Sequence, residues 1–222
     1  MMRENNLLAS TVLLIASSLT IGSFGKGEPA KAAVITFDDA IRGASEYQFD
    51  GDGDGINDVI FSTEDPLGFN TAGPGPNMSF VQEPGLEGTS LLNTDLRVDF
   101  LVGATDYLQF GFALNTGRES NDVFSNIEVY DKNSQLLTSV TELAKFTSPN
   151  GSGRSSFPEG LLKATFQGTA AYAKLNFNSD SSRYIIDNFE GNFGSTEVPE
   201  PLATLALLGI GVVGLNLRRR KQ

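Results

Sequence analysis

Residues 96–115 read "LRVDFLVGATDYLQFGFALN", and this stretch decides the fold class of the chain. The apolar residues Leu96, Val98, Phe100 and Val102 alternate with Arg97, Asp99 and Leu101. The alternation returns over residues 106–115, where Leu108 and Phe110 share one face. A period of two residues is typical of a β-strand with one buried face, because successive side chains point to opposite faces. The stretch therefore predicts two half-buried strands.

More short strands of this kind are expected at residues 34–38, 59–63, 78–83, 162–168, 172–179 and 183–191. A hairpin is expected over residues 126–143, because Asp and Asn in its turn at 131–135 bond to nearby backbone and tolerate unusual dihedrals. Residues 141–146 fit either a helical turn or a continuation of the second hairpin strand. Many short strands with turn signals between them and no long central helix predict an all-β fold, an antiparallel β-sandwich.

The N-terminus has the features of a secretory signal peptide over residues 1–32. Arg3 gives a positive start, residues 7–22 form an apolar signal helix, and Ala30 and Ala32 satisfy an A-x-A rule. These features predict cleavage by signal peptidase after Ala32. The alternative is a membrane anchor that is retained, but the apolar run is short for a bilayer span.

The C-terminus combines three elements over residues 198–222. A Pro-Glu-Pro triplet precedes an apolar run at 202–217, which as a helix is roughly 24 Å long, enough to cross a bilayer with flanking anchors. A basic cluster follows and is expected to stay on the cytoplasmic side. The triplet and the cluster consist of Pro199, Glu200, Pro201, Arg218, Arg219, Arg220 and Lys221. An ordinary single-pass anchor would show the last two elements only.

This order of triplet, transmembrane helix and basic cluster resembles the PEP-CTERM sorting signal of bacteria. The resemblance implies recognition at residues 199–201 by an exosortase-type membrane protease, with residues 218–221 as the stop signal. The protein would be held transiently in the inner membrane and then pass to the cell surface, the extracellular matrix or the medium. The tail indicates where the protein is sent and carries no information about its activity.

One domain is expected between the two ends, over residues 33–197, which is long enough for a real core. This segment has nine basic and 24 acidic residues, a net charge of −15 against −11 for the whole chain. Such a charge repels nucleic acid. The chain has no Cys, His or Trp, which removes the usual zinc ligands, the thiol nucleophile and the Ser-His pair. We therefore expect no enzymatic activity, although paired carboxylates can still hydrolyse glycosides.

The segment "DGDGDGIND" at residues 50–58 places acidic side chains at alternate positions. Ca²⁺ takes six to eight oxygens, and Gly55 permits the sharp turn that such a loop requires. The spacing predicts a structural Ca²⁺ site formed by Asp50, Asp52, Asp54, the carbonyl of Ile56, and Asp58. The alternative is a solvated Gly-Asp turn.

The acidic segment differs from an EF-hand, because Phe61 occupies the place of the bidentate Glu and a strand is expected to follow. It resembles the calcium loops of thrombospondin type 3 and FG-GAP repeats, which implies a bound Ca²⁺. The 126–143 hairpin and "YIIDNFEG" at 184–191 resemble jelly-roll lectin-like and carbohydrate-binding domains. That resemblance implies a jelly-roll-like sandwich and a second cation site formed by Asp38, Asp39 and Asp187. The alternative for Asp187 is a set of turn or edge hydrogen bonds.

The sequence is best interpreted as a non-enzymatic protein of the cell envelope or exopolysaccharide matrix that contacts extracellular polysaccharide. Exposed aromatic side chains would supply sugar platforms, and the candidates are Tyr47, Tyr107, Tyr172 and Tyr184. A purely structural or adhesive surface protein without a glycan ligand is the first alternative. A carboxylate-dependent glycoside hydrolase is the second, and it requires two carboxylates facing each other across a groove.

Overall fold

The computed structural model describes residues 31–88, 96–151, 153–181 and 183–194. Every strand pairing in these ranges is antiparallel, which confirms the expected all-β class. The elements are β1 (Lys31–Ile35), β2 (Glu46–Phe49), β3 (Val59–Thr63), β4 (Phe69–Asn70), β5 (Leu86–Gly88), β6 (Leu96–Leu114), β7 (Phe124–Tyr130), β8 (Leu136–Leu143), the 3₁₀ turn η1 (Pro149–Gly151), β9 (Glu159–Asn178) and β10 (Tyr184–Phe193).

The expected signal helix and transmembrane helix lie outside the described residues. Within the described ranges, no helix has the length and apolar character needed to cross a membrane. β1 begins at Lys31, three residues before the expected strand, and pairs with the end of β10. The predicted cleavage after Ala32 therefore falls inside β1 and would remove two of its five paired residues.

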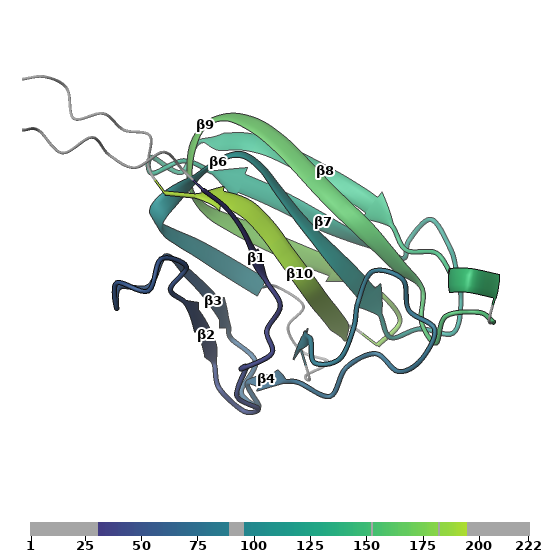
Figure 1. Ribbon diagram of the computed structural model, residues 1–222. Coiled ribbons are helices and arrows are strands. Elements are labelled where there is room, and N and C mark those ends of the chain that lie inside the picture. The colour runs from purple at the N-terminus through teal and green to yellow at the C-terminus, as the bar shows by residue number, and fades with distance from the viewer. Residues whose placement is uncertain (1–30, 89–95, 152, 182, 195–222) are drawn as a thin grey trace, which may run out of the picture.

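The two long strands β6 and β9 run through both layers of the sandwich and pair with each other (Figure 1). The first half of β6 pairs with β3, and its second half pairs with β10. The first layer therefore runs β4-β5-β10-β6-β9, with β1 also on β10, and the second runs β2-β3-β6-β9-β7-β8. The expected antiparallel sandwich is confirmed, with one hydrogen-bonded sheet folded over two bent strands.

The two strands expected within residues 96–115 are one 19-residue strand. Gly103 and Asp106 have φ values of 80° and 68°, and the register with β9 shifts on both sides of them. β9 likewise joins two expected strands through Gly168, whose φ is 91°. Glycine adopts positive φ at little cost and Asp tolerates it, so these residues bend the strands without ending them.

Phenyl rings fill the core between the layers. Phe61 of the second layer meets Phe189 of the first edge to face, with ring centroids 5.0 Å apart. Phe110 stacks on Phe189 at 5.9 Å, and Phe100 stacks on Phe193 at 6.0 Å. These side chains are buried, and each contributes about 1.5–3 kcal/mol by leaving water. The alternation in β6 therefore predicted its buried face correctly.

The hairpin expected at 126–143 forms from β7 and β8, and β8 continues to Leu143. The expectation of a strand at 78–83 is wrong, because this segment is a loop between β4 and β5. Backbone N–H groups in this segment donate to side-chain carboxylates instead of to a neighbouring strand. Glu159 accepts from the N–H groups of Ser79 and Phe80, both at 2.8 Å, and Asp187 accepts from Gln82 at 2.9 Å. Buried backbone donors need a partner, and these carboxylates fix the loop against the first layer.

Replacing Gly111 with Ala tests this loop. A Cβ at Gly111 would overlap the carbonyl oxygen of Phe80, so the loop would have to move away from its carboxylate partners. We expect Gly111→Ala to lower the free energy of unfolding by about 1–3 kcal/mol, measured by urea denaturation. Gly117→Ala is the control, because a Cβ there has open space and should change stability by less than about 0.5 kcal/mol. Equal small effects would contradict the placement of the loop.

Candidate functional site

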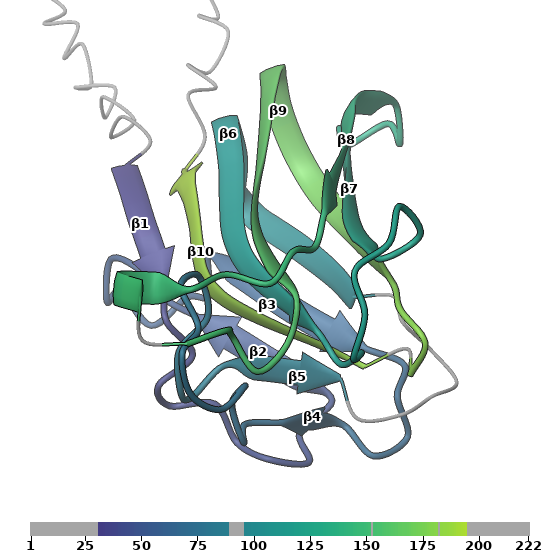
Figure 2. The ribbon, with the colours of Figure 1, turned by 90° about the vertical axis from the view of Figure 1, so that its right-hand side faces the viewer.

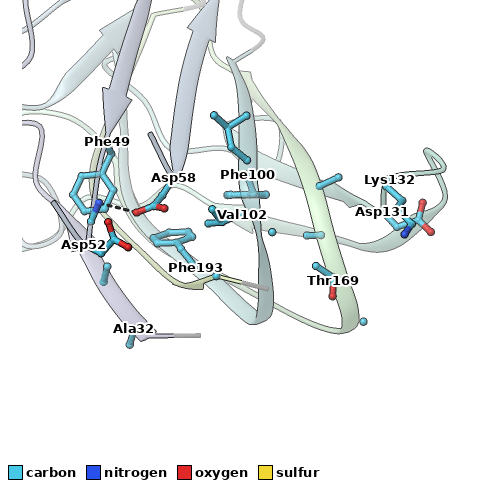
Figure 3. A pocket seen from close by; sticks show the side chains of 18 of the residues that line it. Ala32, Phe49, Asp52, Asp58, Phe100, Val102, Asp131, Lys132, Thr169 and Phe193 are labelled. Atoms are coloured by element: carbon cyan, nitrogen blue, oxygen red, sulfur yellow. Dashed lines mark hydrogen bonds between the residues drawn. The ribbon is translucent and has the colours of Figure 1, made fainter. Parts of the chain in front are cut away.

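A cleft of about 1150 Å³ lies at the end of the sandwich where β10 ends, and is called the terminal cleft below. Figure 3 shows Phe49, Asp52 and Asp58 on one side of it and Thr169 on the other. The turn between β7 and β8 contributes Asp131 and Lys132 on that far side. The bends of β6 and β9 form the floor between the two sides, so the shape of the sheet produces the cleft.

The acidic loop joins β2 to β3 at the wall of the terminal cleft. The two strands pair up to Phe49 and Val59, and the N–H of Asp58 donates to the carbonyl of Phe49 at 2.7 Å. Between them Gly53 and Gly55 take φ values of 76° and 86°, which curl the chain back on itself. The loop is therefore closed at its base, and Gly55 takes the positive φ that the sharp turn requires.

Three of the four predicted carboxylates converge. Ligand oxygens of Asp50, Asp52 and Asp58 lie within 4.8 Å of one another. Asp50 accepts from the N–H of Gly55 at 2.8 Å and from Gly53 at 2.7 Å. The bond from Gly55 is the main cause that lowers the pKa of Asp50 below its ordinary value of 3.8. The loop therefore favours the ionised carboxylate that a cation requires.

The remaining predicted ligands lie outside this group. Asp54 accepts from the N–H of Ile56 at 2.7 Å and does not join the three-carboxylate group. The side chain of Ile56 points to solvent and is 64% exposed. These positions contribute to the turn of the loop, and Ca²⁺ binding by them stays a prediction.

The second predicted site is not assembled as a carboxylate cluster. Asp38 accepts from the hydroxyl of Thr36 at 2.7 Å, and Asp39 accepts from Tyr47 at the same distance. Asp187 is buried and accepts from backbone N–H groups, so the hydrogen-bonding alternative describes it. Desolvation is the main cause that raises its pKa. Across the ranges that the structure describes, Asp50, Asp52 and Asp58 form the one group of three acids close enough to share an ion.

Two of the four candidate tyrosines belong to the core. Tyr184 is 1% exposed and stacks on Phe177 with centroids 4.0 Å apart, so the expectation of a sugar platform there is wrong. Alternation counted back from the buried Phe189 would place Tyr184 on the opposite face, and the register shift between Asp187 and Glu190 brings it to the core. Tyr47 packs edge-on against Phe37 and Phe61.

The other two tyrosines have covered ring faces. Arg97 from β6 lies 4.2 Å from the ring centroid of Tyr172, and Tyr130 from β7 stacks on the same ring at 4.9 Å. Because β9 lies between β6 and β7, Tyr172 is covered from both sides. Lys163 lies 4.5 Å from the ring centroid of Tyr107. The aromatic side chain that sequence reasoning missed is Phe49, which immediately precedes the acidic loop and lines the terminal cleft.

Several solved structures match this chain at low similarity. The catalytic domain of a GH87 α-1,3-glucanase in complex with nigerose has 10% identity and a TM-score of 0.37, over 80% of this chain and 31% of the glucanase chain. A cleaved adhesin domain of Lys-gingipain has 15% identity and a TM-score of 0.34, over 72% and 99%. A variant of the family 29 carbohydrate-binding module CBM29-2 has 15% identity and a TM-score of 0.33, over 78% and 99%.

This chain thus spans about a third of the length of the glucanase, and TM-scores this low carry no argument about ligand or activity. No curated protein sequence matches the chain significantly. Residues 197–221 match the family model of the PEP-CTERM protein-sorting motif. The chain therefore carries a PEP-CTERM protein-sorting motif, which marks it for export and for processing by an exosortase-type membrane protease.

Proposed function

We propose that this protein is a non-enzymatic component of the cell envelope or exopolysaccharide matrix, with a calcium-stiffened sandwich that binds glycan in the terminal cleft. One observation carries the proposal. The carboxylates of Asp50, Asp52 and Asp58 converge at the wall of a large cleft that also holds Phe49. The sorting motif implies export, and both calcium and polysaccharide are available outside the cytoplasm, which supports the proposal.

Calcium fits the acidic loop on chemical grounds. Three carboxylates so close together repel one another, and a divalent cation removes that repulsion. Ca²⁺ prefers carboxylate and carbonyl oxygens, and weak sites fill at the millimolar concentrations found outside cells. Three carboxylates supply at most six of the six to eight oxygens that Ca²⁺ takes, and fewer whenever one of them binds through a single oxygen. Open positions would then remain for water or for ligand hydroxyls, since Asp52 and Asp58 line the cleft.

A polymer fits the terminal cleft better than a single sugar. The volume of the cleft, about 1150 Å³, exceeds that of most small-molecule pockets, which are about 300–1,000 Å³. Phe49 gives an apolar surface, while Asp131 and Lys132 give polar groups on the opposite side. A glycan segment has the matching mixture of apolar C–H faces and hydroxyl groups.

The position of the acids favours binding over hydrolysis. Glycosidases need two carboxylates on opposite sides of the scissile bond. Here the converging carboxylates share one wall and one loop. Asp131 lies on the opposite wall, but it accepts hydrogen bonds from the N–H groups of Gln135 and Asn133, which lower its pKa and disfavour the protonated form that a general acid requires. A purely structural or adhesive role without glycan is the alternative, and it predicts the same calcium response without polysaccharide binding.

We expect calcium to raise the thermal midpoint of the purified protein by several degrees relative to EDTA. A site filled at a hundred times its Kd adds about 2.7 kcal/mol, and each kcal/mol shifts the midpoint by about 2–4 °C for a chain of this size. Asp52→Asn/Asp58→Asn should abolish the shift, and the matched control Asp38→Asn should keep it. A shift that survives the double substitution would exclude the acidic loop.

The calcium response should also be the same at pH 7.0 and pH 5.5. The pKa of Asp50 is lowered in the folded state, so its contribution is present above the ordinary value of 3.8 and is lost only as the pH falls through the folded-state pKa. A response already lost at pH 5.5 would show that other groups control the binding.

The sorting motif makes a separate prediction. In a host with an exosortase, Pro199→Ala/Glu200→Ala/Pro201→Ala should leave the full-length chain in the membrane fraction, because the recognition triplet is gone. Immunoblots of membrane, surface and medium fractions measure this, with Ser195→Ala as the control that is processed normally. Normal processing of the triple variant would contradict recognition at the triplet.

Glycan binding in the cleft is tested by electrophoresis through gels that contain polysaccharide from the producing host. We expect retardation in calcium that is lost with EDTA, with Phe49→Ala and with Asp52→Asn/Asp58→Asn. Tyr172→Ala is the control and should bind normally, because its ring faces are already covered. Absence of retardation in a calcium-responsive protein would favour the purely structural alternative.

A further inference from the structure

A second cavity, of about 150 Å³, lies near the start of β10, beside the short strands β4 and β5. Figure 2 shows these two strands at the end of the molecule opposite the arrowhead of β10. Tyr184, the first residue of β10, lines this cavity, whereas Phe193, the last, lines the terminal cleft. The length of β10 therefore separates the two sites by about 30 Å.

A neutral hydrogen-bonded trio lines the cavity. Asn70 is 6% exposed and donates through Nδ2 to Oε2 of Glu87 at 2.5 Å. Glu87 is 4% exposed and also forms an ion pair with Arg183. A carboxylate this buried needs such partners, and the guanidinium cancels its charge. The cavity therefore suits an uncharged ligand.

Two polar atoms of the trio remain without hydrogen-bond partners among the described residues. They are the acceptor Oδ1 of Asn70 and the donor Nε of Arg183, and both are buried. Leaving such an atom unpaired destabilises the folded state, because the atom has lost its hydrogen bonds to water. A ligand hydroxyl can donate to the first atom or accept from the second once the side chain that carries the atom turns toward the cavity.

The remaining walls and the size of the cavity indicate more than a single water. One water needs about 10–15 Å³ of such space, an order of magnitude less than the volume here. Phe157, Ala113 and Ile185 supply apolar walls that suit C–H groups. Ala72 is exposed and lines the cavity, so a ligand has access from solvent.

We propose that this cavity binds one neutral pyranose unit, such as the end or a branch of a polysaccharide, through hydroxyl contacts with Asn70 and Arg183. The inference rests on the proposed glycan-binding function and adds a second contact to it. Two sites on one chain increase the apparent affinity for a polymer that reaches both, without any change at either site.

The test uses methyl glycosides of glucose, galactose and mannose as probes, titrated in EDTA so that the calcium-dependent cleft does not contribute. Nuclear magnetic resonance follows the side-chain amide of Asn70 and the Nε–H of Arg183. We expect saturable shifts of these signals at millimolar concentrations of at least one glycoside, and none with glucuronic acid, because the cavity is neutral.

Two substitutions locate the binding. Asn70→Ala removes the unpaired acceptor, and Ala72→Phe fills the entrance while keeping every polar group of the trio. Each should weaken binding at least tenfold, whereas Phe49→Ala in the terminal cleft should leave it unchanged.

Glycoside binding that survives Ala72→Phe would overturn the inference, as would the absence of any shift up to 100 mM, which would mean that the cavity holds water only. If the polysaccharide is still retarded through the terminal cleft in that case, the proposed function stands and only the second contact fails. If the cavity binds glycosides but the polysaccharide is not retarded, the terminal cleft fails instead.

Discussion

The antiparallel pairing of β6 with β9 is the constraint on which the rest of the molecule depends. It extends from Leu96 opposite Leu175 to Ala113 opposite Glu159, with two shifts of register. Strands β3 and β10 attach to different halves of β6, and β7 attaches to β9, so both layers are built on this one pair. The register shifts occur where the pair bends, and the bend forms the floor of the terminal cleft. The fold and the candidate site therefore have the same origin.

Features that depend only on neighbouring residues were predicted correctly. Alternation in β6 predicted its buried face, and Asp and Asn in the turn predicted the β7–β8 hairpin. Local sequence failed where a distant partner decides. Gly103 bends β6 without ending it, because β9 resumes pairing beyond it. The loop after Asn77 is not a strand, because carboxylates at positions 159 and 187 take its backbone N–H groups.

The candidate sites divide in the same way. The acidic loop lies between paired strands and draws all its carboxylates from nine consecutive residues, so spacing alone brought three of the four together. Asp54 lies outside this group, and its side chain accepts from the N–H of Ile56. The cavity could not be predicted, since Asn70, Glu87 and Arg183 come from three segments that are joined only by the first layer.

The attachment of the sorting motif relates the two sites to the membrane. Gly194 lines the terminal cleft, and the motif begins three residues later, a distance of at most about 11 Å along a fully extended chain. While the tail is uncut, the terminal cleft is therefore the site tethered closest to the processing enzyme, and the cavity is about 30 Å farther along β10. Polysaccharide in the cleft would crowd the segment that must be cut, whereas polysaccharide in the cavity would not. A calcium-dependent cleft and a calcium-independent cavity would thus allow the chain to contact the matrix before processing and to engage it fully afterwards.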